Sequence, residues 1–193
     1  MPGRRRHADL CPGLFGENGG GIEITYKAFQ MVNHAWIKRI PPTALTKIFL
    51  DATGARDELD LMEGVSNEKY NLTSAMAVEV LQTARAGDRA AQEVIQWAGE
   101  ELGWLAVSVT RQIEMENEDV EIIQSGSIFN AGEIITAPMQ RIIQQAVPRA
   151  RIHRLECPPV VGAVILGMEQ ANFDGYILRA NIITSALEIM RDM

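Results

Sequence analysis

A short turn at residues 125–127 carries the residue types best suited to meet a ligand. Val120 to Ile123 is predicted to form a buried strand, Ser125-Gly126-Ser127 follows it, and a helix is predicted to start at Asn130. Open α/β sheets bind ligands at the carboxyl ends of their strands, and Gly126 would allow a close approach to the backbone. Taken alone, the same residues also fit a simple tight turn, so both interpretations stay open.

A second Gly-rich stretch, FGENGGGIEI at residues 15–24, leads into a predicted helix. A Gly-rich loop before a helix N-terminus can hold an anion on its backbone amides. The stretch lacks the Gly-Lys-Ser/Thr of a Walker loop, and Gly clusters also occur in flexible chain starts. By itself it is a weak indication of a phosphate site.

Other catalytic and metal chemistry finds little support in the residue pattern. The turn serines are not in a Gly-x-Ser-x-Gly elbow and no His is placed to activate them, so nucleophilic catalysis is not expected. The three His residues show no metal-ligand spacing, and the acidic stretch EMENEDVE at 114–121 lacks the glycine and spacing of a calcium loop. We therefore assign no catalytic residue and no metal ligand.

These residues must be positioned by a mostly helical chain. Apolar spacing predicts helices separated by two strands, and Asp88 is expected to cap the longest helix. Residues 55–70 are expected to form only short helical turns, and Trp97 and Trp104, seven apart on the long helix, are expected to pack on a shared face. The predicted helices are 23–38, 43–54, 74–86, 88–114, 131–147, 158–171 and 176–193, and the predicted strands are 120–125 and 148–156.

The two strands and the helix between them predict a parallel βαβ-like unit. Strand 120–125 has apolar residues on both faces, which suits the centre of a sheet covered on both sides. At least two more neighbouring strands would then be needed, and the sequence hardly offers them. We expect a small sheet remnant with strand 120–125 near its centre, in a chain that is part of something larger.

The composition of the chain limits the classes of partner that it is expected to bind. The chain has 193 residues, 47% of them apolar and 22% charged, with a net charge of −7. This favours about one domain, and the acidic balance argues against broad binding to nucleic acid. No apolar segment reaches membrane-spanning length and no export leader is evident, so no membrane association is expected. Cys11 and Cys157 show no recognisable spacing, so a cytoplasmic location is expected.

The order of these motifs resembles the carboxyl-terminal half of the BadF/BadG/BcrA/BcrD-type ATPases and the related N-acetylglucosamine kinases. The motifs are the Gly-rich loop and helix, the long helix from AGDRAAQEVIQWAGEELGW, VEIIQSGSIFNAG and PPVVGAVILGMEQA. Those families belong to the sugar kinase–Hsp70–actin superfamily, with a ribonuclease H-like fold. The resemblance implies a helix-rich α/β, actin-like ATPase C-terminal domain with a reduced sheet at residues 13–171. Residues 1–12 form an irregular segment, and 172–193 an amphipathic helix without a counterpart.

The resemblance also implies site residues. In the family the strand and its small-residue turn lie against the adenosine of ATP, which implies nucleotide contacts at Ser125, Gly126, Ser127 and Asn130. The family's Gly-Asp-Glu-Gly-Ser-Gly loop shapes the sugar and phosphate end of the cleft. It matches Gly16, Glu17, Asn18, Gly19 and Gly20, where Asn18 replaces a carboxylate and Gly20 replaces Ser.

Two hypotheses of different classes follow. The family's Asp-Gly-Gly-x-Thr phosphate loop and its Mg²⁺-linked carboxylates have no match in this sequence, and residues 1–12 do not resemble its second phosphate turn. The first hypothesis is an ATP-binding subdomain that needs a separate N-terminal half, which would supply Mg²⁺ binding and most contacts to an amino-sugar substrate. The second is a non-catalytic helical module that self-associates, as a homodimer, through an exposed apolar edge and the tail helix.

Overall fold

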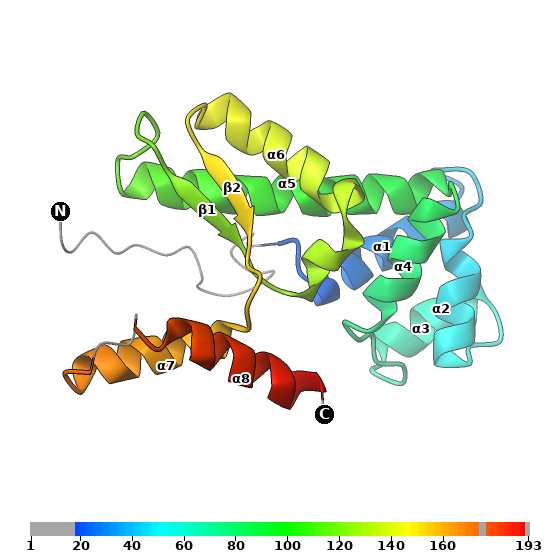
Figure 1. Cartoon of the computed structure of the whole chain (residues 1–193). Coiled ribbons are helices and arrows are strands. Elements are labelled where there is room, and N and C mark those ends of the chain that lie inside the picture. Colours follow the sequence, from blue (N-terminus) through cyan, green and yellow to red (C-terminus); the bar gives the residue numbers. More distant parts are fainter. Residues whose placement is uncertain (1–17, 174–176, 192–193) are drawn as a thin grey trace. The chain divides into compact units, whose positions relative to one another are not determined.

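The chain folds into a helix-rich α/β structure with a small sheet, as the computed structural model in Figure 1 shows for residues 18–173 and 177–191. This coarse fold class was predicted correctly. In chain order the elements are α1 (Gly21–Trp36), α2 (Leu45–Thr53), α3 (Glu58–Ser66), α4 (Met76–Arg85), α5 (Arg89–Gln112), β1 (Glu121–Gln124), the 3-10 helix η1 (Ser127–Ala131), α6 (Glu133–Ala146), β2 (Arg151–Arg154), α7 (Pro159–Gln170) and α8 (Arg179–Arg191).

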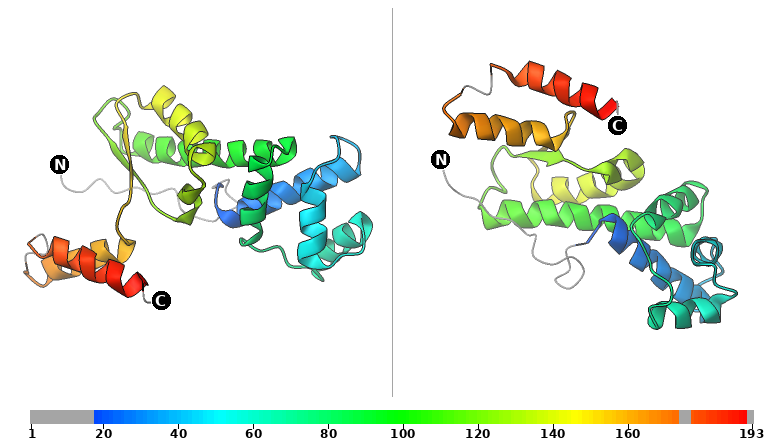
Figure 2. Two further views of the ribbon diagram at one scale, coloured as in Figure 1. Left: turned by 45° about the vertical axis from the view of Figure 1, so that its right-hand side comes forward. Right: turned by 90° about the horizontal axis from the view of Figure 1, so that it is seen from below.

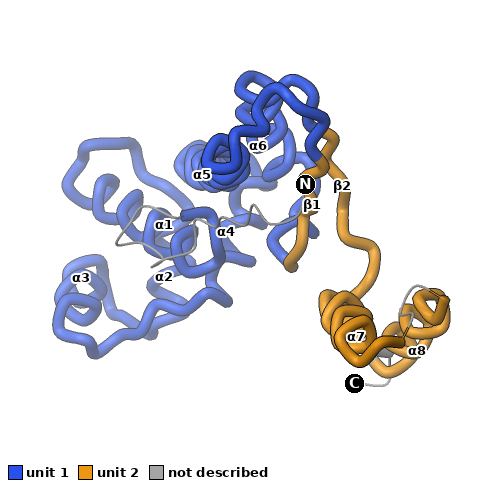
Figure 3. Tube along the Cα trace, turned by 90° about the vertical axis from the view of Figure 1, so that its left-hand side faces the viewer, with its two compact units in different colours: residues 1–120, 127–150 blue, residues 121–126, 151–193 orange. Residues whose placement is uncertain are grey.

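The chain divides into two compact units, coloured separately in Figure 3. The first unit comprises residues 1–120 and 127–150, and therefore contains α1 to α5, η1 and α6. The second comprises residues 121–126 and 151–193, and contains both strands, α7 and α8. The turn at 125–127 thus falls on the boundary between the two units.

The core of the first unit is built by the apolar stripes of α1, α4 and α5. Ile24, Ala28 and Val32 of α1 are fully buried at the i, i+4, i+8 spacing of one helix face. They belong to one apolar cluster with Phe49 of α2 and Val94 and Ile95 of α5, among others. This core positions the amino end of α1 and the whole of α4, which form the site described below.

Two glycines allow α5 and α6 to lie unusually close, side by side in Figures 1 and 2. A Cβ at Gly99 would stand 2.5 Å from the carbonyl oxygen of Ile135, and one at Gly103 would stand 2.8 Å from Cβ of Ile142. Real Cβ atoms do not approach that closely, so both positions require glycine as the helices stand. The close fit holds η1, which directly precedes α6, against the first unit.

Asp88 caps α5 as predicted and also holds the start of α2. Its carboxylate accepts hydrogen bonds from the Ala91 amide at 2.9 Å, the Ala44 amide at 2.8 Å and the Thr43 hydroxyl at 2.8 Å. Burial disfavours the Asp88 charge, but these bonds outweigh it and lower the pKa of the carboxyl. Thr43 is therefore not the N-cap of α2: Ala44 holds that position, and the Thr43 hydroxyl accepts from the Leu45 amide at 3.2 Å.

Two predictions gave the wrong length or starting point for a helix. Residues 55–70 contain a nine-residue helix, α3, because Asp57 caps it by accepting from the Asp60 amide at 2.8 Å. After the turn, the chain does not enter an α-helix at Asn130. It forms η1 first, and Gly132 then turns at a φ of +76° before α6 begins.

The sheet consists of β1 and β2 paired in parallel, with Ile122 opposite Ile152. The prediction of a strand buried on both faces at the centre of a sheet was wrong for the described residues. In them β1 has β2 as its one strand neighbour, and Ile123 is 51% exposed. The expected further neighbours are not found in the described part of the chain, and Glu121 and Ile123, which share one face of β1, are both exposed.

Helices α7 and α8 complete the second unit as a hairpin, and both views in Figure 2 show them side by side. Val161 faces inward and is 2% exposed, whereas much of the remaining apolar surface of α7 is open. Among the described residues, none of the helices combines the length and the apolar character needed to cross a membrane.

The two tryptophans of α5 have different environments, which corrects the prediction that both pack on one face. Trp97 is half-buried and contacts Lys27, whose Nζ lies 5.2 Å from the ring centroid. Trp104 is 46% exposed, with the Arg111 guanidinium 6.0 Å from its ring. Fewer residues are buried in the second half of the 24-residue α5 than in its first half.

Candidate functional site

A pocket of about 340 Å³ lies in the first unit where α1, α4, α5 and η1 meet. Its volume falls in the range of small-molecule sites, about 300–1,000 Å³. The walls are mostly apolar, with a few polar side chains among them. The lining residues are Gly21, Ile24, Ser74, Ala77, Val78, Leu81, Ile95, Ser127, Ile128, Asn130 and Ala131.

The amino end of α1 forms one wall and is fixed to the segment before α4. The buried Thr25 hydroxyl lies 3.0 Å from the carbonyl oxygen of Gly21 and 3.0 Å from that of Thr73. A Cβ at Gly21 would stand 3.2 Å from both Cβ and the carbonyl oxygen of Ser74. Glycine at position 21 therefore lets these two segments approach, and the contact sets the width of the pocket.

The opposite wall, η1, is held by an arginine from α4. The Arg85 guanidinium donates to the carbonyl oxygen of Ala131 at 2.7 Å, across 46 residues of sequence. Ala131 is the buried end of η1, 6% exposed, and it also lines the pocket. Arg85 thus connects two of the elements that form the cavity and keeps Ser127 and Asn130 at its rim.

The lining residues favour a flat, largely apolar ligand with a few polar atoms. Aliphatic side chains such as Ile24, Leu81 and Ile95 offer surface to a ring, while Ser74, Ser127 and Asn130 offer hydroxyl and amide groups for orientation. Neither acidic nor basic side chains belong to the lining. The lining therefore offers apolar surface and a few hydrogen-bonding groups, and no charged side chain.

Two of the four nucleotide-contact residues expected from the sequence, Ser127 and Asn130, line this pocket. The other two, Ser125 and Gly126, follow β1 in the second unit and are exposed. Gly126 adopts a φ of +115° with open space where a Cβ would lie. Its glycine is thus required by the backbone turn whether or not a ligand binds there.

The Gly-rich stretch is described only in part. Gly16 and Glu17 lie outside the described residues. Gly19 is buried at a φ of +109°, where a Cβ would meet Leu102 at 2.8 Å, so it lets the loop lie on α5. Gly20 is the N-cap of α1. A Cβ added at this position would lie against the Glu23 carboxylate.

Asn18 lines a separate groove of about 410 Å³ in the first unit. Tyr26, Lys27, Gln30 and Trp97 are among its other lining residues. The structure therefore places Asn18 in a different cavity from Ser127 and Asn130, and Gly21 marks the point where the Gly-rich stretch reaches the pocket at η1.

Sequence reasoning missed the α4 side of the pocket. Val78 is 55% exposed although its neighbour Ala77 is largely buried, so it stands off the buried stripe of α4. An apolar residue outside the core stripe is the signal that could have indicated this wall. Ser74, just before the helix, looked like an ordinary helix start.

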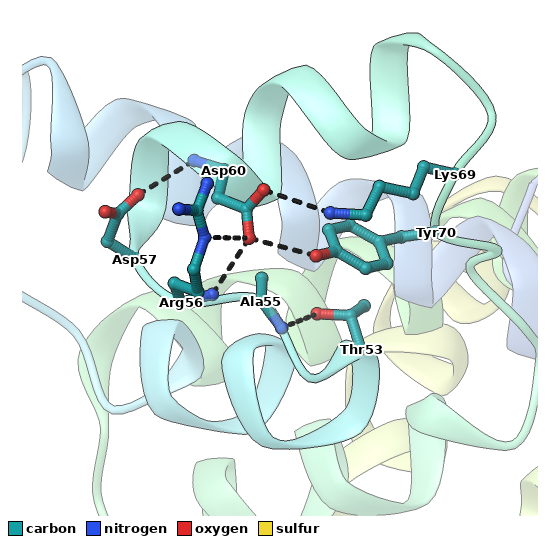
Figure 4. Close-up of polar contacts among 7 residues, drawn as sticks. All are labelled: Thr53, Ala55, Arg56, Asp57, Asp60, Lys69 and Tyr70. Carbon is teal, nitrogen blue, oxygen red and sulfur yellow. Dashed lines mark hydrogen bonds and ion pairs between the residues drawn. The ribbon is translucent and has the colours of Figure 1, made fainter.

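A charged cluster around Asp60 is structural and does not contribute to the pocket lining. In Figure 4 the Asp60 carboxylate accepts from the Arg56 amide at 3.0 Å, the Arg56 Nε at 3.3 Å, the Lys69 Nζ at 3.1 Å and the Tyr70 hydroxyl at 3.0 Å. The Arg56 amide and guanidinium, followed by Lys69 and Tyr70, hold the pKa of Asp60 far below its usual range. The cluster therefore ties the segments before and after α3 to the helix itself.

The part of the chain that the structure describes contains no cluster of side chains suited to bind a metal ion. There, no three His, Cys, Asp or Glu side chains come together in a way that could hold an ion. We therefore assign no Mg²⁺ ligand to these residues.

Comparison with known proteins gives one informative similarity. No family model matches the chain. Over 162 residues it is 25% identical to N-acetyl-D-glucosamine kinase of Dictyostelium discoideum, in an alignment covering 80% of this chain and 50% of that protein. The chain thus spans about half the length of the curated relative it matches. The similarity supports a sugar-kinase-like relationship.

Proposed function

We propose that the chain is the nucleotide-binding part of an N-acetylglucosamine kinase-like protein, related to the BadF-type ATPases and built on the actin-like, ribonuclease H-like fold. The observation that carries the proposal is the pocket itself. It unites Gly21, at the end of the Gly-rich stretch, with Ser127 and Asn130 of the turn, two segments about 100 residues apart in the sequence. The kinase similarity supports the same assignment independently.

In this proposal the pocket takes the adenine base of ATP. The aliphatic walls contact the ring faces, and the side chains of Ser74, Ser127 and Asn130 meet its polar edge. Ser125 and Gly126 are the further nucleotide contacts that the family resemblance implies. Among the described residues of the Gly-rich stretch, Asn18, Gly19 and Gly20 are the ones we assign to the side of phosphate and an amino-sugar substrate.

Phosphoryl transfer, in the same proposal, requires a separate N-terminal half. The reaction depends on positioning and on charge stabilisation by phosphate loops and Mg²⁺. The sequence carries no Asp-Gly-Gly-x-Thr loop, and the pocket lining carries no charge. The chain alone therefore binds nucleotide without turning it over.

The test is calorimetric titration of ATP with Mg²⁺, and of ADP, into the 193-residue chain. Ser127→Trp places a large ring at the exposed rim of the pocket and is expected to weaken binding at least tenfold. Ser108→Trp, at an exposed site in α5 outside the lining, is the matched control and should bind like the parent. Gly126→Val is a poorer probe, because valine at a φ of +115° strains the turn in any case.

A second candidate, a non-catalytic interaction module, is favoured by the exposed apolar surface of the α7–α8 hairpin. The two candidates differ in a simple way. Absence of ATP and ADP binding at millimolar nucleotide would reject the first and leave the second. Binding that is lost in Ser127→Trp and kept in Ser108→Trp would support the first.

A further inference from the structure

A second pocket, of about 310 Å³, lies in the first unit where α1 and the segment after it meet the start of α5. None of the residues that line it also lines the pocket at η1. Its volume is at the lower end of the range for small-molecule sites, about 300–1,000 Å³. The proposed nucleotide binding therefore leaves this cavity without a role.

The inner surface of this second pocket is apolar and has a fixed shape. Met31 and Ala90 are each 8% exposed, and Ile40, also in the lining, is half-buried. Pro41 and Pro42 add two exposed rings, and proline fixes the backbone φ at both positions. A ligand that covers these groups removes apolar surface from water without first having to order the chain.

Asp88 holds the two sides of the second pocket together. Its carboxylate accepts from the Thr43 hydroxyl and from the Ala44 amide, each at 2.8 Å. At the other end of the same segment, the Arg39 amide donates to the carbonyl oxygen of His34 at 2.8 Å. The segment that carries Arg39 is therefore held at both ends, and the pocket is formed before a ligand arrives.

Two guanidinium groups line the second pocket, and one of them lacks a partner in the described part of the chain. The Arg39 side chain is exposed and makes no hydrogen bond or ion pair with another described residue. Arg89 pairs with Glu93 at 3.4 Å, but the two side chains are 91% and 55% exposed, where such pairs contribute little. A guanidinium presents a planar set of N–H donors that matches a carboxylate. Arg39 is thus the group that a ligand anion can meet without breaking an existing contact.

The balance of charge in the second pocket favours a ligand with a single negative charge. The lining holds two carboxylates, those of Asp88 and Glu93, and two guanidiniums, so the formal charges cancel. A monocarboxylate adds one charge opposite Arg39. A phosphate dianion would add a second charge beside Glu93, in a chain whose net charge is already −7.

We propose that this second pocket binds a small monocarboxylate with an apolar body, of the aryl- or alkyl-acetate class. The carboxylate pairs with the Arg39 guanidinium, and the apolar body lies against Met31, Ile40 and Pro42. This binding is independent of the proposed nucleotide binding, because the two pockets share no lining residue.

Titration of the ¹⁵N-labelled whole chain with phenylacetate, followed by NMR, tests this proposal. The amide signals of Ile40, Thr43 and residues 88–93 should shift and reach saturation. Phenylacetamide has nearly the same shape without the charge, and it should bind at least tenfold more weakly. Inorganic phosphate, which carries charge without an apolar body, should also bind more weakly than phenylacetate.

Arg39→Gln removes the guanidinium and should weaken phenylacetate binding at least tenfold. Lys38→Gln is the matched control: Lys38 is the neighbouring exposed cation, it lies outside the lining, and its loss should leave the affinity unchanged. Amide signals far from the pocket that coincide with those of the parent show that both variants keep the fold.

Absence of a saturable shift at Ile40, Thr43 and residues 88–93 with phenylacetate would overturn the proposal. Equal affinity for phenylacetamide, or an Arg39→Gln variant that binds like the parent, would overturn it as well. Tighter binding of phosphate than of phenylacetate would reject the monocarboxylate. Failure of ATP binding would leave this proposal untouched.

Discussion

At the scale of single residues, Asp60 shows how one carboxylate can organise a loop. It is largely buried, at 9% exposure, and takes hydrogen bonds from two cationic side chains, a phenol and a backbone amide. All of these donors favour the ionised form, which is why its pKa lies far below the ordinary value of 3.8. The stabilising effect of Asp60 therefore depends on its charge.

Asp60→Asn should lower the urea midpoint at neutral pH, because an amide neutralises neither Arg56 nor Lys69 and points its own N–H groups at donors. A carboxyl with a depressed folded-state pKa contributes stability that is fully present above its unfolded-state pKa and is lost as pH falls through the folded-state value. The gap between parent and variant should thus narrow progressively below about pH 4. A gap that stays constant from pH 7 to pH 3 would contradict a role for the charge; Asp51→Asn, at an exposed site, controls for general charge removal.

At the scale of helices and strands, the α5–α6 contact depends on the absence of side chains. Gly99 and Gly103 are four residues apart on one face of α5, and a Cβ at either would fall within 3.0 Å of α6. The contact fixes the place of η1 at the amino end of α6, and so it also fixes the pocket wall.

Gly99→Ala should destabilise the first unit by about 1–3 kcal/mol, because overpacking exceeds the gain in helix propensity of about 1 kcal/mol. Gly162→Ala is the matched control: position 162 also lies in a helix, but nothing stands within 4 Å of a Cβ there. It should be neutral or slightly stabilising. Chemical unfolding followed by circular dichroism measures both, and equal effects would refute the close contact.

Helices with a clear apolar stripe could be predicted from the sequence, because burial on one face leaves a 3.6-residue period. This holds for α1 and α5, and the Asp88 cap was also correct since its geometry is local. The burial of β1 could not be predicted, because it depends on neighbours that the described residues do not supply. The α4 wall of the pocket was missed for a similar reason: Val78 acquires its role only when η1, 50 residues away, folds beside it.

In the molecule as a whole, the two units differ in how many of their apolar residues are buried. In the first, buried apolar residues extend from Ile24 to Val147, whereas Val161 is the one buried apolar residue among the described residues of the second. Since a short helical hairpin without a core is marginal in water, the second unit is expected to resist unfolding less than the first.

Hydrogen exchange of the whole chain should therefore separate the two units. Amides of 159–189 are expected to exchange close to the rate of an unfolded chain, while those of α5 between Val94 and Val107 stay protected. Comparable protection in both regions would mean that the hairpin is stable on its own, and that its exposed apolar residues contribute little to its folding.

Hydrogen exchange of the parent chain with and without ATP and Mg²⁺ shows whether the pocket between α1, α4 and η1 binds a nucleotide. Exchange should slow at residues 74–81 and 127–131 when ATP is present, and remain unchanged at 56–70 around Asp60. Because protection reports location as well as binding, it separates this pocket from the groove at Asn18. No slowing at 74–81 and 127–131 with saturating ATP, or slowing confined to other segments, would contradict nucleotide binding at this pocket.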